Sequence, residues 1–244
     1  MNISSLNQRR IANFKANKRG YYSLWLFSIL FIFSLFAEFW ANDKPLLVSY
    51  KDTWYYPVIK DYSETTFGGT LDSNADYRDV YVAGLIQEKG WILWPPIRFS
   101  YSTINYNLTV PAPSPPSTDN WLGTDDQARD VLARVIYGFR ISILFALTLT
   151  ISSSVIGIIT GALQGFYGGW VDLLGQRIIE VWSGLPMLFM LIIMASLVQP
   201  SFWWLLGLML LFSWYELTGL VRAEFLRGRN LEYVRAARAL GLSD

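Results

Sequence analysis

Long apolar runs, separated by clusters of charge, dominate the pattern of hydrophobic and polar positions in this chain. The first run, from 21 to 40, carries one charge, Glu38, near its far end. A second run, from 141 to 163, is uncharged, and so is a longer one from 181 to 215. About 20 apolar residues suffice to cross the roughly 30 Å hydrocarbon layer of a bilayer as a helix. The pattern therefore predicts an all-α polytopic membrane protein.

The longest run exceeds one crossing, and Pro200 interrupts it. Proline lacks the amide hydrogen that a helix interior needs, and its ring clashes with the preceding turn. We therefore expect two helices, at about 178–198 and 202–221, joined by a tight turn. Together with 21–40 and 141–163, they give four predicted spans.

Basic residues flank these runs unevenly. Five precede the first run without any acid, namely Arg9, Arg10, Lys15, Lys18 and Arg19. Five follow the last run, namely Arg222, Arg227, Arg229, Arg235 and Arg238. Because cytoplasmic flanks of spans are enriched in Lys and Arg, we expect the N-terminal segment 1–20 and the C-terminal end in the cytoplasm.

The segment 41–118 is then an external insertion after the first span, and 119–244 holds the rest of the membrane core. The insertion is rich in aromatic residues, and we expect a mixed or irregular fold in which 91–101 could supply strands. A proline-rich run at 110–116 favours extended geometry and predicts a stiff linker.

Composition narrows the possible functions. Hydrophobic residues make up 52% of the chain and charged residues 16%, and the net charge of +1 argues against a nucleic-acid partner. The chain has no Cys and no His, which excludes a disulfide framework, thiol and imidazole catalysis and most zinc sites. The glycine-rich turn at 165–170 lacks the Lys-Ser/Thr of a phosphate-binding loop. We therefore assign no catalytic, metal or cofactor-binding residue and expect a protein that is not an enzyme.

Small and charged residues within the spans are candidates for packing or for a pathway. Gly157, Gly161 and Gly165, spaced four apart, predict a close helix–helix contact, with a moving gate as the alternative. Acidic side chains are costly in a membrane, and kinked helices are tolerated there only where neighbours or cavity water satisfy the backbone. The candidate gate or pathway residues are Gly184, Pro186, Glu180 and Glu216, although Glu180 and Glu216 are close enough in sequence to Arg177 and Arg222 to have a structural role instead.

A polar motif precedes the second span, with Leu122-Gly-Thr-Asp125, Gln127-Ala-Arg-Asp130 and Tyr137-Gly-Phe-Arg140. Thr124 or Asp125 could cap a helix whose apolar stripe follows. This helix is either an interfacial lead into the span or a docking surface. The candidate docking residues are Gly123, Thr124, Asp125, Arg129 and Asp130.

A short helix of small and basic residues, at about 232–242, follows the last span. Its Ala-Ala pair is followed after three residues by glycine, a composition that lets another backbone approach closely. A generic amphipathic cytoplasmic helix is the alternative. The candidate contact residues are Glu232, Tyr233, Arg235, Ala236, Ala237, Ala239, Leu240 and Gly241.

These motifs carry a resemblance. Residues 121–244 resemble the core of the peptide/nickel family of ABC-transporter permeases, in which Leu-Gly-Thr-Asp, Gly-Arg-Asp, Tyr-Gly-x-Arg and the cytoplasmic coupling motif recur in this order. Ala128 stands where the pattern has glycine, and Arg235 stands where it has glutamate. The blocks at 41–48, 67–69, 90–99 and 113–117 are similar to the YejE-type subgroup of microcin C and peptide uptake permeases, which carries a long external insertion.

The resemblance implies a type I ABC-importer transmembrane domain in a bacterial inner membrane. It implies a partner permease in a heterodimer, two cytoplasmic ATPase subunits that use ATP and Mg, and an external solute-binding protein. It also implies that 232–242 is the ATPase-coupling helix and that two further spans follow Asp244. A membrane-anchored sensor or assembly protein with an external domain is the competing interpretation, and a membrane-embedded enzyme acting through Glu180 or Glu216 is a third.

Overall fold

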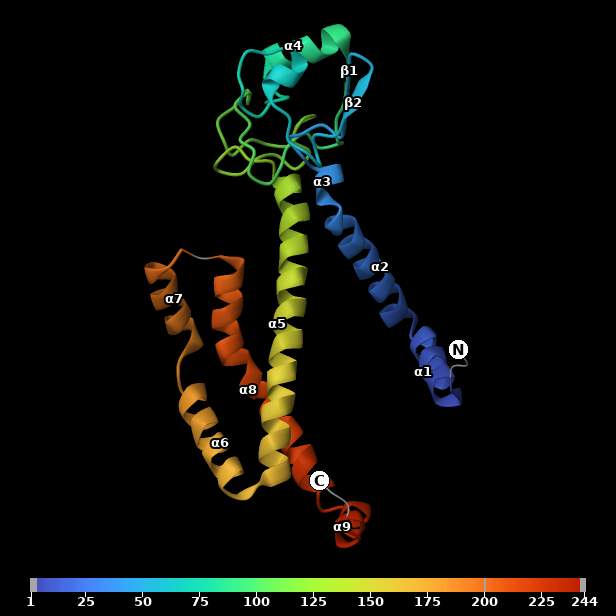
Figure 1. Ribbon diagram of the computed structural model, residues 1–244, viewed down its shortest axis with the longest axis vertical. Helices are drawn as coiled ribbons and strands as arrows, with labels where there is room; N and C mark the ends of the chain where they lie inside the picture. The colour runs from blue at the N-terminus through green and yellow to red at the C-terminus, as the bar shows by residue number, and fades with distance from the viewer. Residues whose placement is uncertain (1–3, 200, 242–244) are drawn as a thin grey trace. The chain divides into compact units, whose positions relative to one another are not determined.

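The computed structural model describes residues 4–199 and 201–241 (Figure 1). The chain divides into two compact units, one ending at Ser142 and the other beginning at Ile143, and helix α5 (Val131–Tyr167) contributes to both. With 37 residues, α5 is about 56 Å long and exceeds the roughly 30 Å hydrocarbon layer of a bilayer.

Two described helices are long and apolar enough to cross a membrane, α5 and α8 (Phe202–Gly228). The pair α6 (Gly169–Ser183) and α7 (Met187–Leu197) qualifies only when taken together, as a segment bent by 67°. The helix expected at 178–198 is therefore not continuous. Pro200, to which we attributed the break before α8, lies outside the described residues.

The first apolar run is also divided. Helix α2 (Lys18–Leu35) follows α1 (Ser5–Ala16), and a four-residue helix, α3 (Ala37–Trp40), comes after Phe36. The expected single helix at 21–40 thus begins three residues earlier and breaks at Phe36. Because α2 includes Lys18 and Arg19, it is less apolar than the run that predicted it, and it is not among the helices that qualify as spans on length and composition.

The insertion contains a three-stranded antiparallel sheet in the order β2-β1-β3, so its fold is mixed. Its strands are β1 (Leu47–Tyr50), β2 (Thr53–Tyr55) and β3 (Gly90–Leu93). The segment 91–101, expected to supply strands, contributes most of β3, whereas the other two strands lie outside the segment considered from the sequence. The two residues between β1 and β2, Lys51 and Asp52, have φ of 50° and 59°. Positive φ at both positions is what a tight two-residue hairpin requires.

An aromatic core holds this sheet to the helices of the insertion, η1 (Glu64–Phe67) and α4 (Val80–Lys89). The core residues are Val48, Tyr50, Phe67, Tyr77, Val82 and Ile86. Phe67 is fully buried, and the rings of Tyr50, Tyr55 and Tyr77 meet it edge-on at 5.2–5.7 Å between centroids. The insertion is therefore a small folded subdomain.

A second buried cluster ties α3 to the start of α5. Ala37, Ala41 and Ala133 are fully buried in it, and the Tyr137 hydroxyl donates a hydrogen bond of 2.9 Å to the Ala41 carbonyl oxygen. Beside it, Arg140 forms an ion pair of 2.9 Å with Glu38. These contacts fix the end of the first apolar segment against the first turns of α5.

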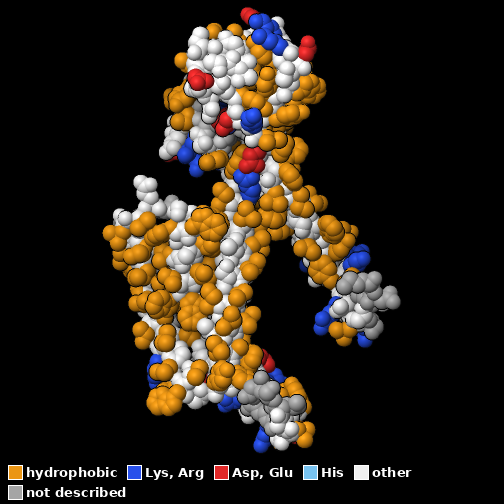
Figure 2. Space-filling model, viewed as in Figure 1, with side chains coloured by type: hydrophobic (Ala, Val, Ile, Leu, Met, Phe, Trp, Pro, Cys, Tyr) orange, Lys and Arg blue, Asp and Glu red, His pale blue; other side chains and the backbone are white. Residues whose placement is uncertain are grey.

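In the unit that begins at Ile143, α6 and α7 expose most of their apolar side chains. Figure 2 shows hydrophobic side chains spread over these helices. Broad apolar exposure of this kind suits lipid or a partner helix rather than water. The short helix α9 (Glu232–Ala239) is the last helix of the described residues.

Candidate functional site

Helices α5 and α8 touch through the three glycines spaced four apart on α5. A Cβ atom on Gly157 would lie 2.7 Å from the Trp214 carbonyl oxygen, and one on Gly161 would lie 2.6 Å from that of Thr218. A Cβ on Gly165 would lie 2.5 Å from the Phe225 Cβ. Any side chain at these positions would push the backbones apart, so the predicted close helix–helix contact is confirmed.

A charged cluster joins α6 to α8 beside this contact. The Arg222 guanidinium binds the Asp172 carboxylate with two hydrogen bonds, one of them 2.7 Å from Nη2 to Oδ2. With its amide oxygen turned toward the guanidinium, Gln176 accepts from Nη1 of Arg222 at 2.8 Å. The acid that Arg222 binds is thus Asp172 on α6, while the role of Glu216, structural or on the pathway, stays a prediction.

A polar cavity of about 140 Å³ lies between α5, α6 and α8, next to this cluster. Gln164, which is 6% exposed, lines it, and its Oε1 has no hydrogen-bond partner among the described residues. Thr160 and Thr218 bridge α5 and α8 by their hydroxyls at 2.9 Å. Buried polar groups without a partner are uncommon, so the orphaned amide oxygen marks a site for water or a polar ligand group.

The break between α6 and α7 falls at the sequence Gly184-Leu-Pro186, as the kink prediction required. Glu180, one turn before it, forms an ion pair of 2.5 Å with Arg177 and lines the same polar cavity. Glu216 on α8 is exposed. The structure therefore brings Glu180 to the cavity, while Glu216 does not line it.

The polar motif before α5 forms a tightly bonded loop. Asp125 accepts hydrogen bonds of 2.9 Å from the backbone N–H groups of Gln127 and Arg129 and from Nε of Arg129, and it also binds Arg134. Burial alone would raise the pKa of the Asp125 carboxyl, but these hydrogen bonds outweigh it and lower the pKa to about 2.

The helix cap lies later than expected. Helix α5 begins at Val131, and the carboxylate of Asp130 accepts from the Ala133 backbone N–H at 2.7 Å, which is the N-cap bond. The cap predicted at Thr124 or Asp125 is therefore wrong. The other carboxylate oxygen of Asp130 accepts a hydrogen bond from the Asn120 side-chain amide at 2.8 Å, and the Asn120 amide oxygen in turn accepts one from Asn105 at 2.9 Å.

The remaining motif residues hold the proline-rich run. The Thr124 hydroxyl accepts from the Ser114 backbone N–H at 2.9 Å, and a Cβ on Gly123 would lie 2.3 Å from the Ser114 carbonyl oxygen. The run is thus docked on the motif and is not a free linker. Thr124 and Asp130 are 5% and 1% exposed, so among the candidate docking residues these two serve the interior of the loop. Ala128, where the family pattern has glycine, takes a φ of 58°.

The C-terminal helix α9 presents one face to its surroundings. Glu232, Arg235, Ala236 and Ala239 are exposed, whereas Ala237 is partly buried. The helix ends at Ala239, earlier than the expected 242, and Gly241 follows with a φ of 79°, the left-handed conformation that terminates helices. Tyr233 and Leu240 are 71% and 82% exposed, while Leu242 lies outside the described residues.

Arg229, between α8 and α9, reaches the end of α5. Its Nη1 donates to the Gly165 carbonyl oxygen at 3.4 Å, and a Cβ on Gly168 would lie 2.4 Å from the same nitrogen. Sequence reasoning missed this contact and the Arg222–Asp172 pair, because their partners are 64 and 50 residues apart. A cationic residue opposite an acid at the same depth of two adjacent spans would be a signal for the Arg222–Asp172 pair, whereas a contact with a backbone carbonyl leaves no such pattern.

Residues 153–244, which hold the glycine contact, the α6–α7 break and α9, match the family model described as "Binding-protein-dependent transport system inner membrane component". This match covers the C-terminal part of the chain and indicates the class of protein, the membrane component of such a transport system. Membership of this class implies that partner subunits hydrolyse ATP and that a binding protein delivers the solute.

Two relatives span nearly the whole chain. The chain is 58% identical over 242 residues to the inner membrane ABC transporter permease protein YejE of Escherichia coli, covering 99% of this chain and 71% of that protein. It is 53% identical to the peptidoglycan transport system permease protein YejE of Agrobacterium fabrum, over 99% and 70% of the two chains. The oligopeptide permease OppC of Bacillus subtilis is 35% identical over 59% of this chain and 46% of its own.

The chain belongs to the ABC-transporter permease family, in its YejE-type group. It is therefore a permease subunit of an ABC import system, a multi-pass inner-membrane protein and a transport component rather than an enzyme. This identification excludes the sensor and membrane-enzyme interpretations as the main function.

Proposed function

We propose that this permease subunit forms half of the translocation pathway of an importer for peptides or peptide-like compounds of the microcin C type, coupled to a cytoplasmic ATPase through α9. The observation that carries the proposal is the exposed face of α9, with small side chains at Ala236 and Ala239, directly after the last apolar helix. Small side chains let the backbone of a partner approach closely, and the match to permeases of peptide systems supports the substrate class.

The proposed membrane domain has the type I arrangement, with residues 1–20 in the cytoplasm, a first span within α2 and α3, and spans within α5, α6–α7 and α8. The basic residues before α2 and after α8 support this orientation. The exposed apolar sides of α6 and α7 support a second permease subunit as a partner in a heterodimer.

The polar cavity near the α6–α7 break is the proposed gate, with Gly184 and Pro186 as the bend and Glu180 at its wall. A bent apolar segment beside a polar cavity in a transport protein supports this assignment. Glu216, which is exposed on α8, would line the pathway where α8 faces the partner permease.

The insertion at 41–118 is the proposed external contact for the binding protein or the partner permease. The motif residues considered for docking lie just after the insertion and are bonded within their own loop, as in the Asp125–Arg129 ion pair. We therefore assign them to shaping the surface of this external region; they are Gly123, Thr124, Asp125, Arg129 and Asp130. Deleting 41–118 should reduce complex assembly or uptake, and unchanged uptake and assembly would contradict the assignment.

The absence of cysteine allows a direct test of coupling. In the full-length permease we would place a cysteine at the exposed Ala236 and treat membranes that contain the ATPase subunits with a thiol–amine crosslinker. We expect an adduct with the ATPase whose yield changes when ATP is added. The partly buried Ala237 should react less, because its side chain faces away from the exposed side of α9.

Val80, which is 87% exposed in the insertion, provides the matched control. A cysteine there should react with a membrane-impermeant maleimide from outside and give no adduct with the ATPase. Equal adduct yields from Ala236→Cys and Val80→Cys, or no adduct from a correctly inserted Ala236→Cys, would overturn the coupling role of α9.

A further inference from the structure

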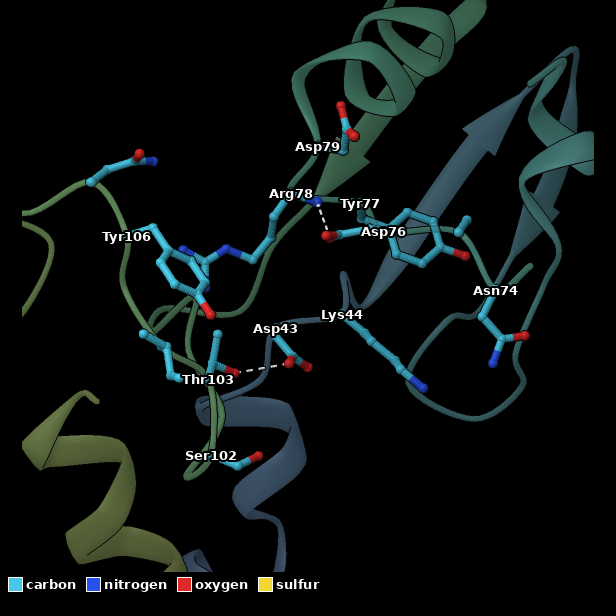
Figure 3. A pocket seen from close by; sticks show the side chains of 13 residues that line it. Asp43, Lys44, Asn74, Asp76, Tyr77, Arg78, Asp79, Ser102, Thr103 and Tyr106 are labelled. Carbon is cyan, nitrogen blue, oxygen red and sulfur yellow. Dashed lines mark hydrogen bonds between the residues drawn. The ribbon is translucent and has the colours of Figure 1, made fainter. Parts of the chain in front are cut away.

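A polar cavity of about 640 Å³ opens in the insertion, between the start of α4, the segment that follows α3 and the loop at 102–107 (Figure 3). Its wall carries charges of both signs. Three of the charged residues are Asp43, Asp76 and Arg78. A volume of this size falls in the range of about 300–1,000 Å³ that small-molecule sites have.

The Arg78 guanidinium is an unused hydrogen-bonding group in this wall. Among the described residues it forms no ion pair and donates no side-chain hydrogen bond, and its Nη1 is enclosed by protein without a partner. It lies over the Phe99 ring at 4.4 Å from the centroid. Burial lowers the pKa of Arg78, although the charges of Asp43 and Asp76 oppose this effect.

Arg78 also lies between two cavities. A second one, of about 570 Å³, shares Tyr77, Arg78 and Asn107 with the first. The planar guanidinium has five N–H donors and matches a carboxylate with two parallel hydrogen bonds. Leaving the enclosed Nη1 donors unpaired is costly, and a ligand carboxylate would remove that cost.

The acids of the wall retain acceptor capacity. Asp43 accepts from the Thr103 hydroxyl at 2.8 Å, and Asp76 accepts from the Arg78 backbone N–H at 2.9 Å. An ionised carboxylate offers about four acceptor positions, so each can take a further donor. Lys44, by contrast, is bound to Asp61. A ligand with only a negative charge would be repelled by Asp43 and Asp76, whereas one that also carries an ammonium group would be attracted to them.

We propose that this cavity is a binding site for a small zwitterionic molecule, whose carboxylate pairs with Arg78 and whose ammonium group lies against Asp43 and Asp76. The site is in the insertion and is separate from the gate and the coupling helix, so it goes beyond the proposed transport function and does not rest on it.

The test uses the full chain in lipid nanodiscs and titration calorimetry with alanyl-alanine. Two derivatives of the same size remove one charge each: the N-acetyl form has no ammonium group, and the C-terminal amide has no carboxylate. We expect alanyl-alanine to bind and each derivative to bind at least about tenfold more weakly, because each derivative loses the charge-assisted hydrogen bonds of one end.

Arg78→Gln should weaken the binding of alanyl-alanine to the level seen with its C-terminal amide, so that this variant binds the dipeptide and the amide almost equally. Arg98→Gln is the matched control, because Arg98 also lies over an aromatic ring, Trp94 at 5.7 Å, but lines only the second cavity. The Arg98→Gln variant should bind alanyl-alanine as tightly as the unaltered chain.

Arg78→Lys keeps the charge and loses the planar fork, and it decides the matter if Arg78→Gln does not fold. We expect Arg78→Lys to weaken the binding of alanyl-alanine several-fold. The proposal is overturned if alanyl-alanine does not bind, if either derivative binds as well as alanyl-alanine, or if a folded Arg78 variant binds it as tightly as the unaltered chain.

Discussion

Replacing Gly161 by alanine places a methyl group at the centre of the α5–α8 contact. The new Cβ would lie 2.6 Å from the Thr218 carbonyl oxygen and 2.8 Å from the Val221 Cβ, whereas ordinary contact begins at 3.4 Å. The two backbones must therefore separate by about 0.8 Å at this point. The Thr160–Thr218 hydroxyl bond, now 2.9 Å, would be stretched past hydrogen-bonding distance by the same movement.

Two effects of opposite sign follow. Forcing an extra methyl group into a close contact costs about 1–3 kcal/mol, and a lost hydrogen bond between membrane helices adds about 0.6 kcal/mol. Alanine is the better helix former by about 1 kcal/mol, which offsets part of this loss. Gly207→Ala on α8 isolates the second effect, because a Cβ there meets nothing within 4 Å.

Unfolding by SDS in mixed micelles, followed by circular dichroism, would give the free energy of unfolding of both variants. We expect Gly161→Ala to be less stable than Gly207→Ala by about 1.5–3.5 kcal/mol. If the two variants unfold at the same SDS fraction, α5 and α8 do not pack through this glycine and the reasoning is refuted.

Three other outcomes follow from the geometry. Because the pKa of Asp125 is depressed to about 2, the stability that its carboxylate contributes is complete above about pH 4 and disappears as the pH falls through 2. Asp125→Asn should therefore lower the free energy of unfolding by about 2 kcal/mol at neutral pH and flatten its dependence on acid pH. An unchanged acid profile would contradict this. In a double-mutant cycle, Asp172→Asn and Arg222→Gln should couple by about 0.5–3 kcal/mol in SDS unfolding, whereas simple additivity would show that their ion pair contributes nothing. Gly90→Ala would put a Cβ 1.8 Å from a β1 carbonyl oxygen, so amide exchange in β1 and β3 should accelerate, while Gly84→Ala, with open space around its Cβ, should leave exchange unchanged.

Local features of the sequence predicted much of the membrane unit. Runs without charge located α5 and α8, the four-residue spacing of glycines located their contact, and the Gly184–Pro186 pair located the bend between α6 and α7. These features work because each depends on residues within a few turns of one another. Their boundaries shifted where caps decide them, as at Asp130, which forms the N-cap in place of Thr124.

Pairings between distant segments could not be predicted. Arg222 has Glu216 within two turns, yet it binds Asp172, because only the packing of α6 on α8 decides which acid is near. The β1–β2 hairpin was missed for a local reason: Lys51 and Asp52 lack the Asn-Gly or Asp-Gly signal that usually marks such a turn. The unpaired guanidinium of Arg78 also has no sequence signature, since its isolation is a property of the fold.

The contact of Arg229 with the last turn of α5 has an electrostatic consequence. The carbonyl groups at a helix C-terminus carry about half a negative charge, so a guanidinium there is attracted to the whole helix dipole and not only to the Gly165 oxygen. This attraction is screened by salt, with a Debye length of about 10 Å at 0.1 M. The attraction between the end of α5 and Arg229, in the segment that leads into α9, should therefore weaken as ionic strength rises. The glycine contact between α5 and α8 depends on shape alone and should stay the same.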